Sequence, residues 1–138
     1  MENPSCRRTV GSLAACLASV MAATALVATG QAQTPVDLEA ARRQFVTSCG
    51  TCHAVEAGAP ARQGPNLSGV YGRRAGTPPD FRYSPALQGA DIVWNEATLD
   101  PWIENAQAMR PGTIMNYRQA DPAKRRLIIA FLKSISPQ

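Results

Sequence analysis

Apolar residues recur at the spacing of an amphipathic helix in two segments of the chain. One segment lies just before a cysteine pair, and the other lies at the C-terminal end. The first stripe consists of Leu38, Ala41, Phe45, Val46 and Cys49, and the second of Leu127, Ile128, Phe131, Leu132 and Ile135. On the second segment, the opposite side is expected to face water with Lys124, Arg125, Arg126 and Lys133. These patterns predict one helix near each end of the folded domain.

Helix-start signals, in which proline follows a capping residue, agree with these two helices and predict two more. Thr34 is expected to cap the first helix, with Pro35 as its first residue and Asp37 in its first turn. The other signals are Ser84-Pro85, which predicts a short helix, Asp100-Pro101, and Asp121-Pro122, which starts the last helix.

The start of the third helix has an alternative at Asn95, which could cap a helix from Glu96. Pro101 would then remove a backbone hydrogen bond near the middle of that helix, so the sequence favours Asp100-Pro101 as the start. On either reading the helix carries Trp102 and Ile103. It is expected to end before the turn Arg110-Pro111-Gly112.

Residues 54–79 have no helical or strand periodicity and are rich in glycine and proline. A loop of this length is uncommon in a compact domain and usually has a function. No other segment alternates as a strand does, and no internal repeat is present. We therefore predict an all-α fold with about four to five helices and long loops rich in glycine and proline.

The first helix leads directly into Cys49-Gly50-Thr51-Cys52-His53. Two cysteines separated by two residues and followed by a histidine are the attachment signature of a c-type haem. The spacing follows from the chemistry, because each thiol adds to one of two neighbouring vinyl groups and the imidazole then lies below the iron. We predict one covalent haem c on Cys49 and Cys52, with His53 as an iron ligand and the long loop wrapped around the cofactor.

The cysteine pair has two other possible interpretations, a redox-active dithiol and a zinc site. A thioredoxin-type dithiol needs a strand before the motif and a βαβ unit around it, whereas a helix is predicted before Cys49. A zinc site needs four ligands, and beyond residue 32 the chain has no cysteine or histidine other than Cys49, Cys52 and His53.

Residues 1–32 are predicted to be a cleaved signal peptide, and residues 33–138 the folded domain. Arg7 and Arg8 precede an apolar run from about residue 10 to residue 27, and Gly30-Gln31-Ala32 offers small residues for cleavage. This signal predicts export to the bacterial periplasm. The alternatives are an uncleaved membrane anchor, lipidation at Cys16, and twin-arginine export through Arg7 and Arg8.

The charge of the predicted domain suggests its partners. Residues 33–138 carry 12 basic and 9 acidic side chains, so the excess of positive charge is small. This charge suits transient contact with an acidic redox protein and falls far short of that of a nucleic-acid-binding protein. We expect a monomer that is not stably inserted in a membrane once the signal is removed.

The second iron ligand follows from elimination, since His53 is the only histidine of the chain. The remaining strong candidates in the domain are Met109, Met115, Lys124 and Lys133. The lysines lie on the predicted solvent face of the last helix. Met115 follows Pro111-Gly112-Thr113, a turn that can hold a side chain in place, and it is therefore favoured over Met109.

An ordered set of further motifs extends along the domain. The set consists of Gly64-Pro65-Asn66-Leu67, Tyr71-Gly72-Arg73, Trp94, Thr98-Leu99 and Pro111-Gly112-Thr113-Ile114-Met115. Together with the haem motif, it resembles class I c-type cytochromes, in the branch that contains mitochondrial cytochrome c and its soluble bacterial relatives. The resemblance covers essentially all of residues 33–138 and implies the compact cytochrome c fold.

The resemblance also implies roles for individual residues. The Pro65 carbonyl is expected to accept the His53 ring proton. Arg73, Tyr83 and Trp94 are expected to hydrogen-bond or neutralise a buried haem propionate, with Thr113 supporting that region. Trp102 stands where a tyrosine of the family often contacts the ligand sulfur, and Phe45 is expected where the first and last helices cross.

These observations lead to three functional hypotheses. The first is a soluble one-electron carrier without enzymatic activity, which moves electrons between a dehydrogenase and an oxidase or reductase. The second is a haem enzyme or gas sensor in which Met115 leaves the iron. The third is a dedicated cytochrome subunit of one dehydrogenase.

Overall fold

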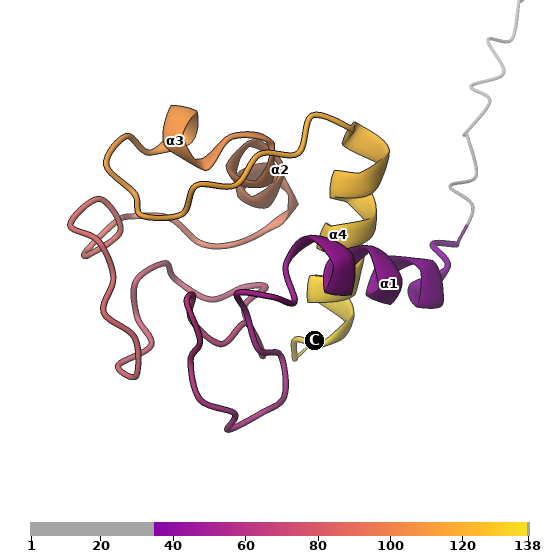
Figure 1. Cartoon of the computed structure of the whole chain (residues 1–138), viewed down its shortest axis with the longest axis horizontal. Helices are drawn as coiled ribbons and strands as arrows, with labels where there is room; N and C mark the ends of the chain where they lie inside the picture. The colour runs from indigo at the N-terminus through magenta and orange to yellow at the C-terminus, as the bar shows by residue number, and fades with distance from the viewer. Residues whose placement is uncertain (1–34, 138) are drawn as a thin grey trace, which may run out of the picture. The chain divides into compact units, whose positions relative to one another are not determined.

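A computed structural model of the protein describes residues 35–137. Its helices are α1 (Leu38–Ser48), α2 (Glu96–Glu104), α3 (Ala106–Met109) and α4 (Pro122–Ser134). Within the described residues there is no strand, and an isolated bridge pairs Arg74 with Val93. The all-α prediction is confirmed. A long connection without regular helices winds from α1 to α2 (Figure 1).

Helix α1 begins later than predicted. Asp37 caps it, and one carboxylate oxygen of Asp37 accepts hydrogen bonds from the backbone N–H groups of Glu39 (2.9 Å) and Ala40 (3.2 Å). Pro35 therefore lies before the helix, and the start predicted at Thr34-Pro35 is wrong. An aspartate is the stronger cap here because its charge also interacts favourably with the helix dipole. Thr34 itself lies outside the described residues.

Helix α2 begins at Glu96, so the predicted start at Asp100-Pro101 is also wrong, and Pro101 lies inside the helix. The Asn95 side chain accepts from the Thr98 N–H, and the Thr98 hydroxyl accepts from the Asn95 N–H, which forms a reciprocal capping box. This cap, and the burial of Leu99, Trp102 and Ile103 on one face, offset the hydrogen bond that proline removes.

The short helix predicted at Ser84-Pro85 is a turn. The N–H groups of Leu87 and Gln88 both donate to the Ser84 carbonyl, and the turn ends at Gly89, whose φ is +68°. That positive φ is readily adopted by glycine and stops helical continuation. The predicted helix is therefore wrong, and the Ser84 hydroxyl does not act as a cap.

Helices α1 and α4 cross in the centre of the core (Figure 1). The rings of Phe45 and Phe131 lie at the crossing with their centroids 4.8 Å apart, and Ala41 beside them is fully buried. The predicted position of Phe45 is thus confirmed. The apolar faces of two distant segments are buried against each other, which holds the two ends of the described chain together.

We expect Phe45→Ala to destabilise the haem-loaded protein by about 3–5 kcal/mol, because removing a fully buried ring leaves a cavity between α1 and α4. Denaturant unfolding followed by far-ultraviolet circular dichroism measures the change. Val46→Ala is the matched control, since Val46 is the next residue of α1 and is 54% exposed. Equal stability losses in the two variants would contradict this description of the core.

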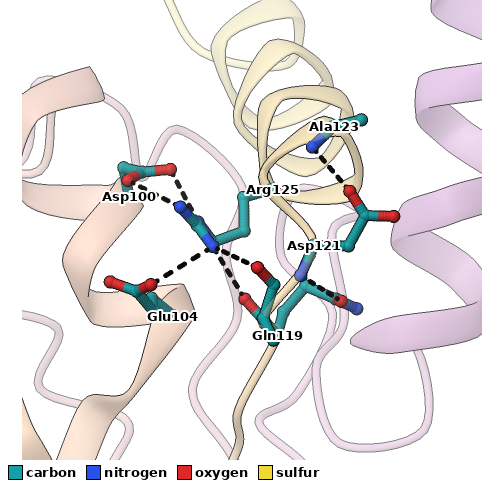
Figure 2. A network of polar contacts seen from close by, with 7 residues as sticks. Asp100, Glu104, Gln119, Asp121, Ala123 and Arg125 are labelled. Carbon is teal, nitrogen blue, oxygen red and sulfur yellow. Dashed lines mark hydrogen bonds and ion pairs between the residues drawn. The ribbon is translucent and has the colours of Figure 1, made fainter.

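Asp121 caps α4 and Pro122 is its first residue, as predicted, but Arg125 does not point to water. Its guanidinium donates from Nε to Asp100 Oδ1 at 2.8 Å and from Nη1 to the carbonyls of Gln119 and Ala120. Figure 2 shows this buried side chain between α2 and α4, with Glu104 nearby. The hydrogen bond to Asp100 is the main cause of the raised pKa of Arg125. Arg125 therefore joins α2, α4 and the segment before α4.

None of the helices within residues 35–137 is long and apolar enough to cross a membrane. The predicted signal peptide, residues 1–32, lies outside the described residues. The same holds for Cys16 and for the pair Arg7 and Arg8.

Candidate functional site

A cavity of about 410 Å³ lies among the haem motif, the long loop, α2 and the segment before α4. All ten residues that the sequence predicted for the haem line it. They are Cys49, Cys52, His53, Pro65, Arg73, Tyr83, Trp94, Trp102, Thr113 and Met115. Most of the remaining wall is apolar, with Leu67, Val70, Leu87, Leu99, Ile103, Ile128 and Leu132. Residues that are distant in sequence are thus brought to one apolar chamber with a few polar groups, which is typical of a cofactor site.

The two cysteines lie at the C-terminal end of α1. Cys49 is the C-cap of the helix, and its carbonyl accepts hydrogen bonds from the N–H groups of Cys52 (3.1 Å) and His53 (3.0 Å). This tight turn brings both thiols and the imidazole to the cavity wall. No disulfide joins Cys49 and Cys52.

The environment of Cys49 is unlike that of a redox-active dithiol. Burial, with a smaller contribution from the charge of Cys52, raises the pKa of the Cys49 thiol to about 12. Reactive dithiols work through a thiolate of lowered pKa. A helix also precedes the motif where the thioredoxin interpretation requires a strand.

The orientation of His53 is set by the backbone of the next loop. Its Nδ1 lies 2.8 Å from the Pro65 carbonyl oxygen. Because a carbonyl can only accept, Nδ1 carries the proton and Nε2 keeps its lone pair. Burial lowers the pKa of His53, and the contact with Pro65 opposes this in part. The imidazole is therefore held in the neutral form that binds metals.

Gly64 leaves the space in which the His53 ring lies. A Cβ atom at residue 64 would overlap the ring atoms Cε1, Nδ1 and Nε2 of His53. The Gly64 N–H donates to the Cys52 carbonyl at 2.9 Å, so the loop is fixed against the motif. The sequence analysis assigned no role to Gly64, although a glycine directly before Pro65 is the signal that could have indicated one.

The two methionines occupy different places. Met115 is half-buried and lines the cavity, whereas Met109 packs against the core and is absent from the cavity wall. Lys124 and Lys133 are exposed on α4, and the ammonium of Lys133 lies 5.6 Å from the centre of the Tyr71 ring. Among the four candidate second ligands, Met115 alone shares the cavity with His53.

A polar group of residues lies on one part of the cavity wall. Arg73 donates from Nη1 to the Ser68 carbonyl (2.9 Å) and from Nη2 to the Asn66 carbonyl (3.2 Å), while its buried Nε has no partner within the described residues. The Ser84 hydroxyl is likewise buried without a partner there. Burial raises the pKa of the neighbouring Tyr83, which keeps the phenol protonated as a donor.

Ser84 is a cavity-lining residue that was not predicted from the sequence, because the pattern Ser84-Pro85 is also typical of a helix cap. An unpaired buried donor is costly, since it has lost its hydrogen bonds to water. The unpaired donors of Arg73 and Ser84 therefore require a hydrogen-bond acceptor inside the cavity. The carboxylates of a haem supply such acceptors, so the polar wall fits the predicted cofactor.

Two aromatic rings and a threonine complete the cavity wall. The rings of Trp94 and Trp102 lie 5.2 Å apart, and both residues are buried. Thr113 is 4% exposed, and its hydroxyl lies 3.4 Å from the Met115 N–H. The thiols, the oriented imidazole, the thioether and the unpaired donors thus form a set that fits a c-type haem.

Comparison with known proteins indicates the same cofactor as the side chains that line the cavity, a c-type haem. The family model described as Cytochrome c matches residues 38–136. A cytochrome c of Sesamum indicum is 38% identical over 100 residues, which cover 72% of this chain and 90% of the relative. One of Chlamydomonas reinhardtii is 39% identical over 98 residues, or 70% of this chain and 88% of the relative. One of Euglena viridis is 39% identical over 100 residues, or 72% of this chain and 97% of the relative.

These relatives also correct one prediction. We predicted export to the bacterial periplasm from the N-terminal segment, but the relatives are cytochromes c of plants and algae, which are not bacteria. The periplasmic location is therefore wrong. An apolar run after two arginines shows that a segment resembles a targeting signal, but it does not identify the membrane that the signal addresses. By the family match and the extent of these similarities, the chain belongs to the cytochrome c family and carries covalently attached haem c.

Proposed function

We propose that this protein is a soluble one-electron carrier whose haem is attached to Cys49 and Cys52 and ligated by His53 and Met115. Proteins of the cytochrome c family are haem-based electron carriers. Haem attachment and ligation by these four residues are proposed because their side chains line a single cavity. When bound, the haem supplies an iron that gains and loses one electron.

His53 is suited to permanent ligation. The Pro65 carbonyl fixes the tautomer and the ring orientation, as outer contacts of metal-ligating histidines generally do. Gly64 lets the ring lie against the loop without overlap. The imidazole therefore needs no rearrangement when the iron changes its charge.

Met115 would supply the iron with a soft, weakly donating thioether. Such a ligand favours ferrous iron and raises the reduction potential. If His53 and Met115 both bound the iron, no coordination position would be open to a substrate. This supports electron transfer rather than an enzymatic reaction.

Arg73, Tyr83, Ser84 and Trp94 are proposed to hold the propionates. Arg73 Nε and the Ser84 hydroxyl are buried donors that lack partners within the described residues, and the Tyr83 phenol is kept protonated. Donors of this kind stabilise carboxylates in an apolar cavity. Thr113 is proposed to support the same region, and Trp102 to contact the sulfur of Met115.

The proposed partners are a dehydrogenase as electron donor and an oxidase or reductase as acceptor, each bound transiently by the monomer. Several exposed residues at the rim of the cavity are uncharged, among them Gln63, Ile114 and Asn116, and Ile114 is 64% exposed. A short-lived contact of these uncharged rim residues with a partner fits weak redox encounters.

Absorption spectra of the haem-loaded protein test the ligation and hence the function. We expect a low-spin ferric form with the weak far-red band of a thioether bound to iron, and a ferrous form that does not bind carbon monoxide at neutral pH. A high-spin ferric form, or tight carbon monoxide binding by the unaltered protein, would contradict the carrier proposal. That result would support the haem enzyme or gas sensor instead.

A further inference from the structure

The segment that carries Met115, residues 113–120, bends at Ile114 and continues without a helix, and within the described residues it has no sheet partner. From Thr113 to Ala120 the residues alternate in exposure, with the odd-numbered residues facing inward and the even-numbered residues exposed. This is the periodicity of a β-strand. Among residues 35–137, however, no strand pairs with the segment, so its backbone lacks the hydrogen bonds that usually fix an extended chain.

The two ends of the segment are anchored. At its start the Thr113 N–H donates to the Arg110 carbonyl at 3.2 Å. At its end the Gln119 N–H donates to the Ile103 carbonyl at 3.0 Å, and Arg125 donates to the carbonyls of Gln119 and Ala120. The part between these anchors contains the proposed iron ligand.

Gln107, on α3, contacts this central part. Its Nε2 lies 2.5 Å from the Thr113 carbonyl oxygen and 3.4 Å from the Met115 carbonyl oxygen. Both partners can only accept, so the amide nitrogen faces them with its two hydrogens. In the described part of the chain, no other group outside the segment hydrogen-bonds to its backbone between Ile114 and Arg118.

We infer that Gln107 is a positioning residue that sets the register of this segment and so presents Met115, rather than its neighbours, to the iron. The bend at Ile114 lets the single amide nitrogen of Gln107 contact the carbonyls on both sides of it, those of Thr113 and Met115. A slip of one residue would turn Met115 outward and Ile114 inward. The side-chain amide takes the place of the missing neighbouring strand.

This inference rests on the proposed ligation by Met115. The test uses the haem-loaded protein with Gln107→Glu and Gln107→Leu, and imidazole as the competing ligand of the ferric iron. The Glu variant preserves size but turns carboxylate oxygens toward two carbonyl oxygens, whereas the Leu variant removes the donor. We expect imidazole to bind about five- to tenfold more tightly in Gln107→Leu, and at least as tightly in Gln107→Glu.

The far-red band should also disappear at a lower temperature in both variants, while global unfolding followed by circular dichroism changes much less. A merely structural role would shift both transitions together. Gln44→Glu is the matched control, because Gln44 lies on α1 and its amide donates to Ser48. We expect the control to keep the imidazole affinity of the unaltered protein.

The outcomes distinguish the two proposals. If the unaltered protein lacks the far-red band, ligation by Met115 fails and the inference about Gln107 fails with it. If the unaltered protein has the band, and both Gln107 variants keep its thermal midpoint and the unaltered imidazole affinity, the inference about Gln107 alone is wrong.

Discussion

Met115→Ala should convert the ferric haem protein from low-spin to high-spin and abolish its far-red band. Met115 is the only candidate second ligand on the cavity wall, and the side chains beside it, Thr113 and Ile114, offer no strong iron ligand. Outer contacts of a metal ligand are each worth about 10- to 100-fold in affinity, so loss of the ligand itself should have a larger effect. We therefore expect imidazole affinity to rise by more than about a hundredfold.

Met109→Ala is the control for this substitution. Met109 is half-buried in the core and does not line the cavity, so its loss should reduce stability while the spectrum stays unchanged. A variant Met115→Ala with an unaltered low-spin spectrum would refute the proposed ligation. Loss of the far-red band in Met109→Ala, but not in Met115→Ala, would assign the ligand to Met109.

Gly64→Ala should strongly perturb the haem site through a single added methyl group. The new Cβ would overlap the His53 ring, and the residue cannot retreat because its N–H is bonded to the Cys52 carbonyl. Overpacking of this kind costs about 1–3 kcal/mol. The displaced ring should also lose its contact with Pro65, which makes the imidazole a weaker donor and so raises the reduction potential, or should produce a high-spin fraction. Spectroscopy, potentiometry and denaturant unfolding of the haem-loaded variant measure these effects.

Gly58→Ala is the control that distinguishes the effect of this overlap from the effect of ordinary backbone strain. Gly58 lies in the same loop with φ +77°, and an added Cβ there would meet no atom within 4 Å. The left-handed backbone should cost Gly58→Ala about 1 kcal/mol without altering the spectrum. If Gly64→Ala kept the unaltered spectrum and stability, the loop would not constrain His53 as described.

Much of the site could be predicted from the sequence because covalent chemistry dictates its spacing. Cys49, Cys52 and His53 must be close in sequence to reach two vinyl groups and one iron. Because the chain has a single histidine, the candidates for the second iron ligand were likewise limited to two methionines and two lysines. The resemblance to a known family then supplied Pro65, Arg73 and the other lining residues, whose roles toward the haem stay predictions.

The helix starts were less predictable, because several local signals compete within a few residues. At residues 95–101 two start signals overlap, and burial of Leu99 and Trp102 decided in favour of the one that keeps proline inside the helix. At Ser84 the hydroxyl that resembled a cap is buried in the cavity wall instead. Local propensity is a weak guide where tertiary burial selects between alternatives.

By itself, the sequence determined that this is an all-α protein with one covalent haem, a single histidine and a methionine after a Pro-Gly turn. These features follow from which residues are present and from their short spacing in the sequence, and neither depends on the fold. Only the tertiary structure decided that Met115 rather than Met109 reaches the cavity, that Arg125 is buried between α2 and α4, and that Gln107 contacts the ligand segment. Such contacts join distant segments, and which segments meet is decided by the packing of the whole core.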